Sequence, residues 1–182
     1  MTEWLDVVDK NGAPTGQQVE RERAHREGIR HRTAHVWLLR HHAGQTEILL
    51  QMRSKDKDSF PGCYDISSAG HIPAGESVTE SALRELREEL GVTVEAEALI
   101  PCGQRCFFSH LSFRGQPFLD NQISDVFCLW LDRDEADFTV QKSEVECVRW
   151  MEFEQCVQAV AQGSIPSAIV PEELEMVRRK LP

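Results

Sequence analysis

The stretch Gly70–Val92, GHIPAGESVTESALRELREELGV, decides the fold of this chain. Within it, apolar residues of the segment Thr79–Leu90 return every three or four positions, which predicts an amphipathic helix. Ser77 and Glu80 have the spacing of a capping box at the start of that helix. Gly91 is a typical residue at a helix C-terminus. The stretch therefore predicts one helix with an apolar face and an acidic face.

The acidic face carries Glu85, Glu88 and Glu89, spaced at i, i+3 and i+4. Carboxylates at this spacing lie side by side and repel one another. A cation of the Mg²⁺ type prefers oxygen ligands and would turn that repulsion into attraction. Taken alone, such a run is also typical of the solvated face of an ordinary surface helix. The residues around the run distinguish these two interpretations.

The complete stretch matches the pattern G-x5-E-x7-R-E-U-x-E-E-x-G-U, in which U is an apolar residue. The matching fixed residues are Gly70, Glu76, Arg84, Glu85, Glu88, Glu89 and Gly91. This pattern is the signature of the Nudix hydrolases, and the chain resembles that family throughout this stretch, here called the Nudix box (70–92). The resemblance implies an α/β/α sandwich with a mixed sheet, formed by residues 1–182 as a single domain. The alternation of strand-like and helix-like segments independently indicates an α/β domain.

The resemblance also implies an activity and a cofactor. We expect an enzyme that hydrolyses a diphosphate linkage in a small organic di- or triphosphate, with a nucleoside as one candidate group, using Mg²⁺ or Mn²⁺. By likeness to the family, Glu85 and Glu89 are expected metal ligands. Glu88 is expected to be a further ligand or the base that activates water. Glu85 and Glu88 are the expected catalytic residues.

Three residues of the box have expected supporting roles. Arg84 is expected to orient the carboxylate of Glu76 beside the metal ligands. Gly70 would let the backbone approach the metal closely. These roles follow from the family likeness and from the residue types.

A second likeness reaches beyond the box. It rests on the segments DVVDKNGAPTG (6–16), AHREGIRH (24–31), QMRSKDKDSFPG (51–62) and SSAGH (67–71). These resemble the type I isopentenyl-diphosphate isomerases and their uncharacterised hydrolase-like relatives. In the isomerases a basic pair before the F/W-P-G turn holds the substrate diphosphate. Arg53 and Lys57, in the charged loop Arg53–Asp58, occupy that place; the alternative is a solvated loop without such a role.

The groups that donate and accept protons in the isomerases are missing from this chain. The isomerases use a cysteine before the G-H pair, where this chain has Ala69. Their second glutamate of an E-N-E segment corresponds to Gln122. We therefore favour hydrolysis, with isomerase-like activity as one alternative. The other alternative is a non-catalytic ligand-binding module, although such modules usually lose a glutamate of the box and this chain keeps all of them.

The isomerases also bind a metal through three histidines. His25, His31 and His71 stand at comparable places in this chain. From the residues alone we favour three separate roles: a helix-surface His25, a strand-edge His31 and a cleft-lining His71. The sequence places His35 in no recognisable group, and the same holds for His41, His42 and His110.

Composition limits the partners. The 182 residues include 20 basic and 30 acidic residues, a formal net charge of −10, which argues against binding a nucleic-acid polymer. No apolar run approaches the ~18 residues of a membrane span. The six cysteines form no C-x-x-C pair and the N-terminus lacks a signal-peptide pattern, so we expect reduced thiols and a cytoplasmic protein. A small-molecule diphosphate is the expected partner, and exposed packing of Leu111, Phe113 and Phe118 would allow a homodimer.

The remaining pattern predicts the elements around the box. Strands are expected at 33–40, 47–52, 92–99, 104–113, 123–131 and 145–151. Further helices are expected at 18–26, 153–161 and 171–180.

Overall fold

A mixed sheet forms the centre of the protein. The structure, a computed structural model, describes residues 2–57, 59–113 and 115–182, so Asp58 of the charged loop lies outside the described residues. The sheet has seven strands: β3 (His31–His42), β4 (Gln45–Arg53), β5 (Tyr64–Asp65), β6 (Ser68–His71), β7 (Ile100–Phe113), β8 (Gln116–Trp130) and β9 (Val145–Glu152). Strand β3 pairs in parallel with β8 and antiparallel with β4 and β6. This arrangement confirms the predicted mixed sheet.

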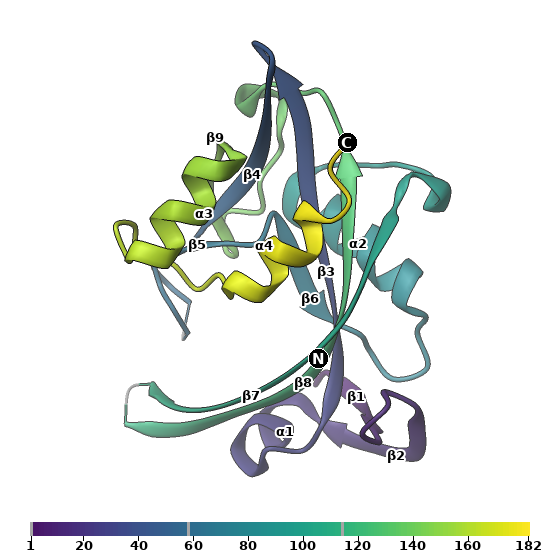
Figure 1. Cartoon of the computed structure of the whole chain (residues 1–182). Helices are drawn as coiled ribbons and strands as arrows, with labels where there is room; N and C mark the ends of the chain where they lie inside the picture. Colours follow the sequence, from purple (N-terminus) through teal and green to yellow (C-terminus); the bar gives the residue numbers. More distant parts are fainter. Residues whose placement is uncertain (1, 58, 114) are drawn as a thin grey trace.

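Helices cover both faces of this sheet (Figure 1). Successive residues of a strand point to opposite faces. Val36 and Leu38 of β3 accordingly pack with Leu86 of α2 (Val78–Leu90). On the other face, core side chains of β3 pack against α3 (Phe153–Gln162) and α4 (Pro171–Arg178). The predicted α/β/α sandwich is confirmed.

Helix α2 begins and ends as its sequence predicts. Ser77 and Glu80 form a complete capping box: the Ser77 Oγ accepts from the Glu80 backbone N–H at 3.3 Å, and the Glu80 carboxylate accepts from the Ser77 N–H at 3.1 Å. Gly91 ends the helix at φ 65° and its N–H donates to the carbonyl of Arg87. A left-handed residue at this position is easiest for glycine. The box helix is thus fixed by local interactions.

An N-terminal unit packs beside the sheet. Strands β1 (Trp4–Val8) and β2 (Pro14–Glu20) form a two-stranded sheet, followed by α1 (Arg21–Glu27). The predicted helix therefore starts three residues later than expected, because Gln18–Glu20 pair with β1 instead. A hydrogen bond of 2.8 Å from the Gly75 N–H to Asp6 joins this unit to the Nudix box.

One predicted strand is wrong. Val92 and Leu99 are buried in the core beside α2, but the residues between them include a 3-10 helix, η1 (Ala96–Ala98), and are largely exposed. Val92 and Leu99 hold the two ends of this segment in the core, and pairing with the sheet begins only at Ile100 of β7. A second 3-10 helix, η2 (Glu135–Asp137), precedes β9. Within the part of the chain that is described, no helix has the length and apolar character needed to cross a bilayer.

Candidate active site

Glu89 is the most deeply buried carboxylate of the Nudix box. Its side chain faces β6, where one carboxylate oxygen accepts a hydrogen bond of 3.2 Å from the Ala69 N–H. Burial raises the pKa of Glu89 to about 8, and the nearby charge of Glu85 adds to the rise. A positive charge beside this carboxylate would stabilise its charged form.

Glu85 lies against the backbone of the same strand. A Cβ atom placed on Gly70 would be 2.2 Å from the Glu85 Cδ, so any larger residue would displace this carboxylate. Burial raises the pKa of Glu85, while Arg84 opposes the rise. Gly70 therefore permits a close approach between β6 and the box helix.

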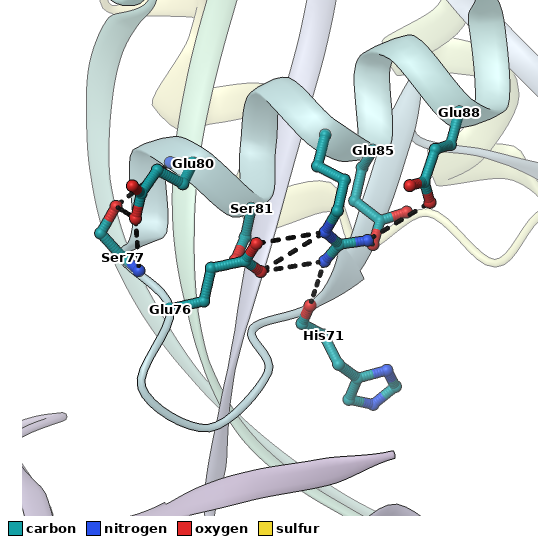
Figure 2. Close-up of polar contacts among 8 residues, drawn as sticks. His71, Glu76, Ser77, Glu80, Ser81, Glu85 and Glu88 are labelled. Atoms are coloured by element: carbon teal, nitrogen blue, oxygen red, sulfur yellow. Dashed lines mark hydrogen bonds and ion pairs between the residues drawn. The ribbon is translucent and has the colours of Figure 1, made fainter. Parts of the chain in front are cut away.

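Arg84 connects the carboxylates on the outer side of the helix. Its guanidinium donates to Glu85 at 2.7 Å and to Glu88 at 3.4 Å. It also contacts Glu76 at 3.3–3.4 Å and the carbonyl of His71 at 3.4 Å. Figure 2 shows Glu76, Glu85 and Glu88 gathered along this side of α2. The expected contact with Glu76 is present, and Arg84 additionally engages two of the expected metal-site glutamates.

These residues fit a hard divalent cation by their chemistry. Glu85 and Glu89 offer carboxylate oxygens whose charged forms burial disfavours, and Glu88 offers a more exposed one. Oxygen donors of this kind suit Mg²⁺ or Mn²⁺. Across residues 2–57, 59–113 and 115–182 the three carboxylates do not converge into one cluster of ligand atoms. Arg84 engages Glu85 and Glu88, whereas Glu89 bonds to the β6 backbone.

Arg53 and Lys57, the two loop residues expected to hold the diphosphate, each contact a carboxylate. Arg53 donates to Asp65 at 2.9 Å and to the backbone oxygen of Ser59 at 3.0 Å, which folds the loop back on itself. Lys57 forms an ion pair with Glu144. Glu144 also contributes to the raised pKa of Glu89, after burial and Glu85, which places the Lys57 pair near the box helix.

The three histidines converge, which corrects the separate roles favoured from the sequence. One ring nitrogen of each of His25, His31 and His71 lies within 4.8 Å of the others, and the Nε2 atoms of His25 and His71 are 3.1 Å apart. His25 is buried rather than on the helix surface, and His31 is fully buried. Sequence alone could not place them together because they come from α1, β3 and β6.

The histidines are also in the form that binds metals. Burial lowers the pKa values of all three rings, that of His25 to about 3, so they are neutral. His31 Nδ1 lies 2.9 Å from the carbonyl oxygen of Ile29, an arrangement that leaves Nε2 free. Asp120 lies beside them, 3.9 Å from His25. We name His25, His31 and His71 the histidine cluster.

Sequence reasoning missed a buried polar network around Glu173. This α4 residue accepts hydrogen bonds from His35 at 2.9 Å, from Trp37 at 3.1 Å and from Arg105 at 2.8 Å. Burial alone would raise the pKa of Glu173. The charges and hydrogen bonds of His35 and Arg105 have the larger effect and lower the pKa of Glu173 to about 2. The available signal was the position of Glu173 on the apolar stripe of its helix, three and four residues before Met176 and Val177.

Comparison with known proteins identifies the family. A model of the NUDIX domain matches residues 29–170. Nudix hydrolase 3 of Arabidopsis thaliana is 41% identical over 156 residues, which cover 84% of this chain and 20% of that protein. The chain thus spans about a fifth of the length of that relative. The uncharacterised Nudix hydrolase YfcD of Escherichia coli is 32% identical over 155 residues, covering 85% of this chain and 76% of that protein.

Solved structures share the fold. A Deinococcus radiodurans protein superposes with a TM-score of 0.68 at 23% identity, covering 97% of this chain and 98% of that one. The NUDIX domain of Shewanella oneidensis NrtR, determined with ADP-ribose, has a TM-score of 0.63 at 20% identity and covers 83% and 88% of the two chains. Together with the family match and the YfcD likeness, the intact box on α2 leads to one conclusion: the chain belongs to the Nudix family.

Proposed function

We propose that this protein is a metal-dependent hydrolase that cleaves a diphosphate linkage in a small organic di- or triphosphate, with nucleoside-containing compounds as the first class to test. One observation carries the proposal. Glu89 is buried and Glu85 is half-buried against β6, where Gly70 admits Glu85 and the Ala69 N–H binds Glu89. Arg84 already pairs with Glu85, whereas the Ala69 N–H that binds Glu89 is neutral, so a metal cation beside Glu89 would offset the cost of burying its charge.

The residues of the box have distinct tasks in this reaction. Glu85 and Glu89 would hold Mg²⁺ or Mn²⁺, and a bound ion would supply positive charge to the phosphate oxygens and acidity to a nearby water. Glu88, the most exposed of the three, accepts the proton of the attacking water. The water oxygen forms a bond to phosphorus as the bridging P–O bond breaks, and the leaving phosphate takes the bonding electrons. Arg84 keeps Glu85 and Glu88 oriented through its contacts with both.

The relatives support this activity and the class of substrate. YfcD and the Arabidopsis protein are named Nudix hydrolases. The NrtR domain binds ADP-ribose, a diphosphate that joins a nucleoside to a sugar.

The six cysteines bear on where the reaction takes place. All six are free thiols, which supports action in the reducing cytoplasm.

A substrate panel with metal removal tests the proposal. Nucleoside di- and triphosphates, ADP-ribose and isopentenyl diphosphate would be incubated with Mg²⁺, with Mn²⁺ and with excess chelator. We expect release of phosphate or a monophosphate from at least one compound with either metal, and none with chelator. Absence of hydrolysis across the panel would instead favour the ligand-binding module.

Lys57 and Arg53 are proposed to hold the substrate diphosphate. Replacing Lys57 with glutamine is expected to raise KM about 10-fold with a smaller change in kcat, because one charge-assisted hydrogen bond to phosphate is lost. Steady-state kinetics on the best panel substrate would measure this. Lys55→Gln, an exposed neighbour in the same loop, is the matched control. Equal KM values for the two variants would contradict the role of Lys57.

The histidine cluster favours a second proposal, a metal site like that of the isomerases. By likeness to the isomerases, we propose that His25, His31 and His71 bind a transition-metal ion. The same face of the sheet carries Ala69 and Gln122, which pair in register with His35 and His31. Neither supplies the acidic proton that isomerisation requires, so we propose a metal site without isomerase activity. Formation of dimethylallyl diphosphate from isopentenyl diphosphate would contradict this.

Metal analysis tests the histidine cluster. After dialysis against Zn²⁺ and then metal-free buffer, we expect the wild-type protein to retain one more zinc ion than a His31→Gln variant, because the ring nitrogen that completes the cluster is removed. His110→Gln, which changes an exposed histidine outside the cluster, should retain the wild-type amount. Equal zinc content in all three proteins would rule out a metal at this cluster.

A further inference from the structure

Strand β7 forms one edge of the seven-stranded sheet. It is the last strand in the order β5-β4-β3-β8-β7, and its only partner strand among the described residues is β8. Within that part of the chain, residues 100–113 make no backbone–backbone hydrogen bond outside the ladder with β8. In an antiparallel ladder the N–H and C=O groups of alternate residues point away from the partner. Those groups of β7 are therefore open to a further strand.

The outer half of this strand lies beyond the cover of α4. The helix contacts the inner half, because a Cβ atom on Gly103 would lie 3.4 Å from Met176 and Arg105 bonds to Glu173. Figure 1 shows the β7–β8 hairpin extending past α4 and curving outward. We name residues 106–113 the β7 edge. At about 3.4 Å per residue, these eight residues span roughly 27 Å.

One face of the β7 edge is open to solvent. Four alternate residues of this face are exposed: Cys106, Phe108, His110 and Ser112. Phe108 is 63% exposed, the largest fraction among the exposed large apolar side chains of the described residues. Phe113 and Phe118, two of the residues considered for a homodimer contact, instead pack on each other with ring centres 5.4 Å apart. Phe108 is therefore the apolar side chain that the hairpin offers to a partner.

The β7 edge also lacks the features that usually prevent strand pairing. Natural sheets protect a free edge with charged side chains, proline or a β-bulge. Residues 106–113, CFFSHLSF, contain no aspartate, glutamate, lysine, arginine or proline. The irregularity in the β7 ladder lies between Pro101 and Gly103, before the β7 edge begins. A long, uncharged and partly apolar edge of this kind is a template for another strand.

Charge identifies a second copy of this chain as the strand that fits. The chain has a formal net charge of −10, so two copies repel each other wherever their charged surfaces meet. A contact without carboxylates avoids the cost of placing like charges together. A basic partner would instead be drawn to the acidic surface, which the β7 edge does not share. Pairing about a two-fold axis is antiparallel and places uncharged side chains opposite uncharged side chains in every register within residues 106–113.

We propose that two copies of this protein pair along their β7 edges, antiparallel and about a two-fold axis, so that their two seven-stranded sheets become one continuous sheet. Backbone hydrogen bonds supply the affinity, and Phe108 is covered by the other copy. The contact is small for a protein interface, so the dimer forms reversibly and depends on concentration. This inference is independent of the hydrolase function proposed above.

Sedimentation velocity in the presence of a reductant tests the pairing. From about 1 to 200 μM protein, we expect the average mass of the wild type to rise from the monomer toward twice the monomer. Phe108→Lys should raise the dissociation constant at least about 10-fold, because it brings two like charges into the contact. Cys106→Lys, on the same exposed face, should reproduce this loss. Trp4→Lys changes an exposed apolar residue outside the hairpin and should match the wild type.

Hydrogen exchange locates the contact without any variant. Exchange of the backbone amides of residues 106–113 should slow as the wild-type concentration rises, while exchange in the exposed helix η1 should stay constant. A monomer at every concentration would overturn the inference, including the case in which the edge accepts a strand of another protein. A dimer that survives both Phe108→Lys and Cys106→Lys, or exchange at 106–113 that ignores concentration, would overturn it as well.

Discussion

Replacing Glu89 with glutamine is expected to lower Mg²⁺-dependent hydrolysis at least about 100-fold, since loss of a group that only orients a metal ligand already costs ~10- to 100-fold. The fold should survive. Burial raises the pKa of Glu89 to about 8, so a neutral side chain is already favoured there without metal, and glutamine keeps the oxygen that accepts from Ala69. Metal-dependent product release and thermal unfolding would be measured on the same protein.

Two companion variants make this result specific. Glu97→Gln removes an exposed carboxylate in η1 and should retain full activity. Glu88→Gln separates the two roles considered for that residue. If Glu88 is the base, kcat falls while the metal concentration for half-maximal activity is unchanged; if it is a ligand, that concentration rises. Wild-type turnover by Glu89→Gln would refute the metal site on α2.

The second large effect concerns stability. Glu173→Gln is expected to lower the free energy of unfolding by about 3–5 kcal/mol, because Arg105 would keep a buried charge without its partner. Arg105 is 3% exposed and Glu173 is 1% exposed, so solvent cannot compensate. Urea unfolding would measure the loss. Glu172→Gln, at the exposed neighbouring position, should change stability by less than about 0.5 kcal/mol.

The pH dependence of unfolding provides an independent check of Glu173. Its pKa is lowered from 4.5 to about 2, so its stabilising contribution is complete above pH 4.5 and is lost as the pH falls toward 2. The wild type should lose stability across this window more steeply than Glu173→Gln. Parallel curves for the two proteins would show that the network does not depend on the ionised carboxylate.

The box helix was predictable because its determinants are local. The Ser77 cap, the apolar repeat and the Gly91 terminus lie within one short segment, and all three occur as expected. The segment 92–99 was mispredicted for a related reason. Its apolar residues at both ends resemble a strand, but pairing with the sheet is a tertiary event that the segment does not encode.

The histidine cluster and the Glu173 network were not predictable in the same way. His25, His31 and His71 converge only after α1, β3 and β6 pack together. Glu173 is one of several acidic residues in the short C-terminal helix, and its partners His35 and Arg105 are distant in sequence. The position of a charge on an apolar stripe was a real signal, but it names no partner.

The parallel pairing of β3 with β8 has a consequence for how the protein folds. Nine residues of β3, His31–Leu39, pair with residues 91 positions further along the chain. Closing so long a loop is entropically costly and slows folding. His31 of the histidine cluster lies in this paired part of β3, so the cluster should become protected from hydrogen exchange only after the box helix has formed.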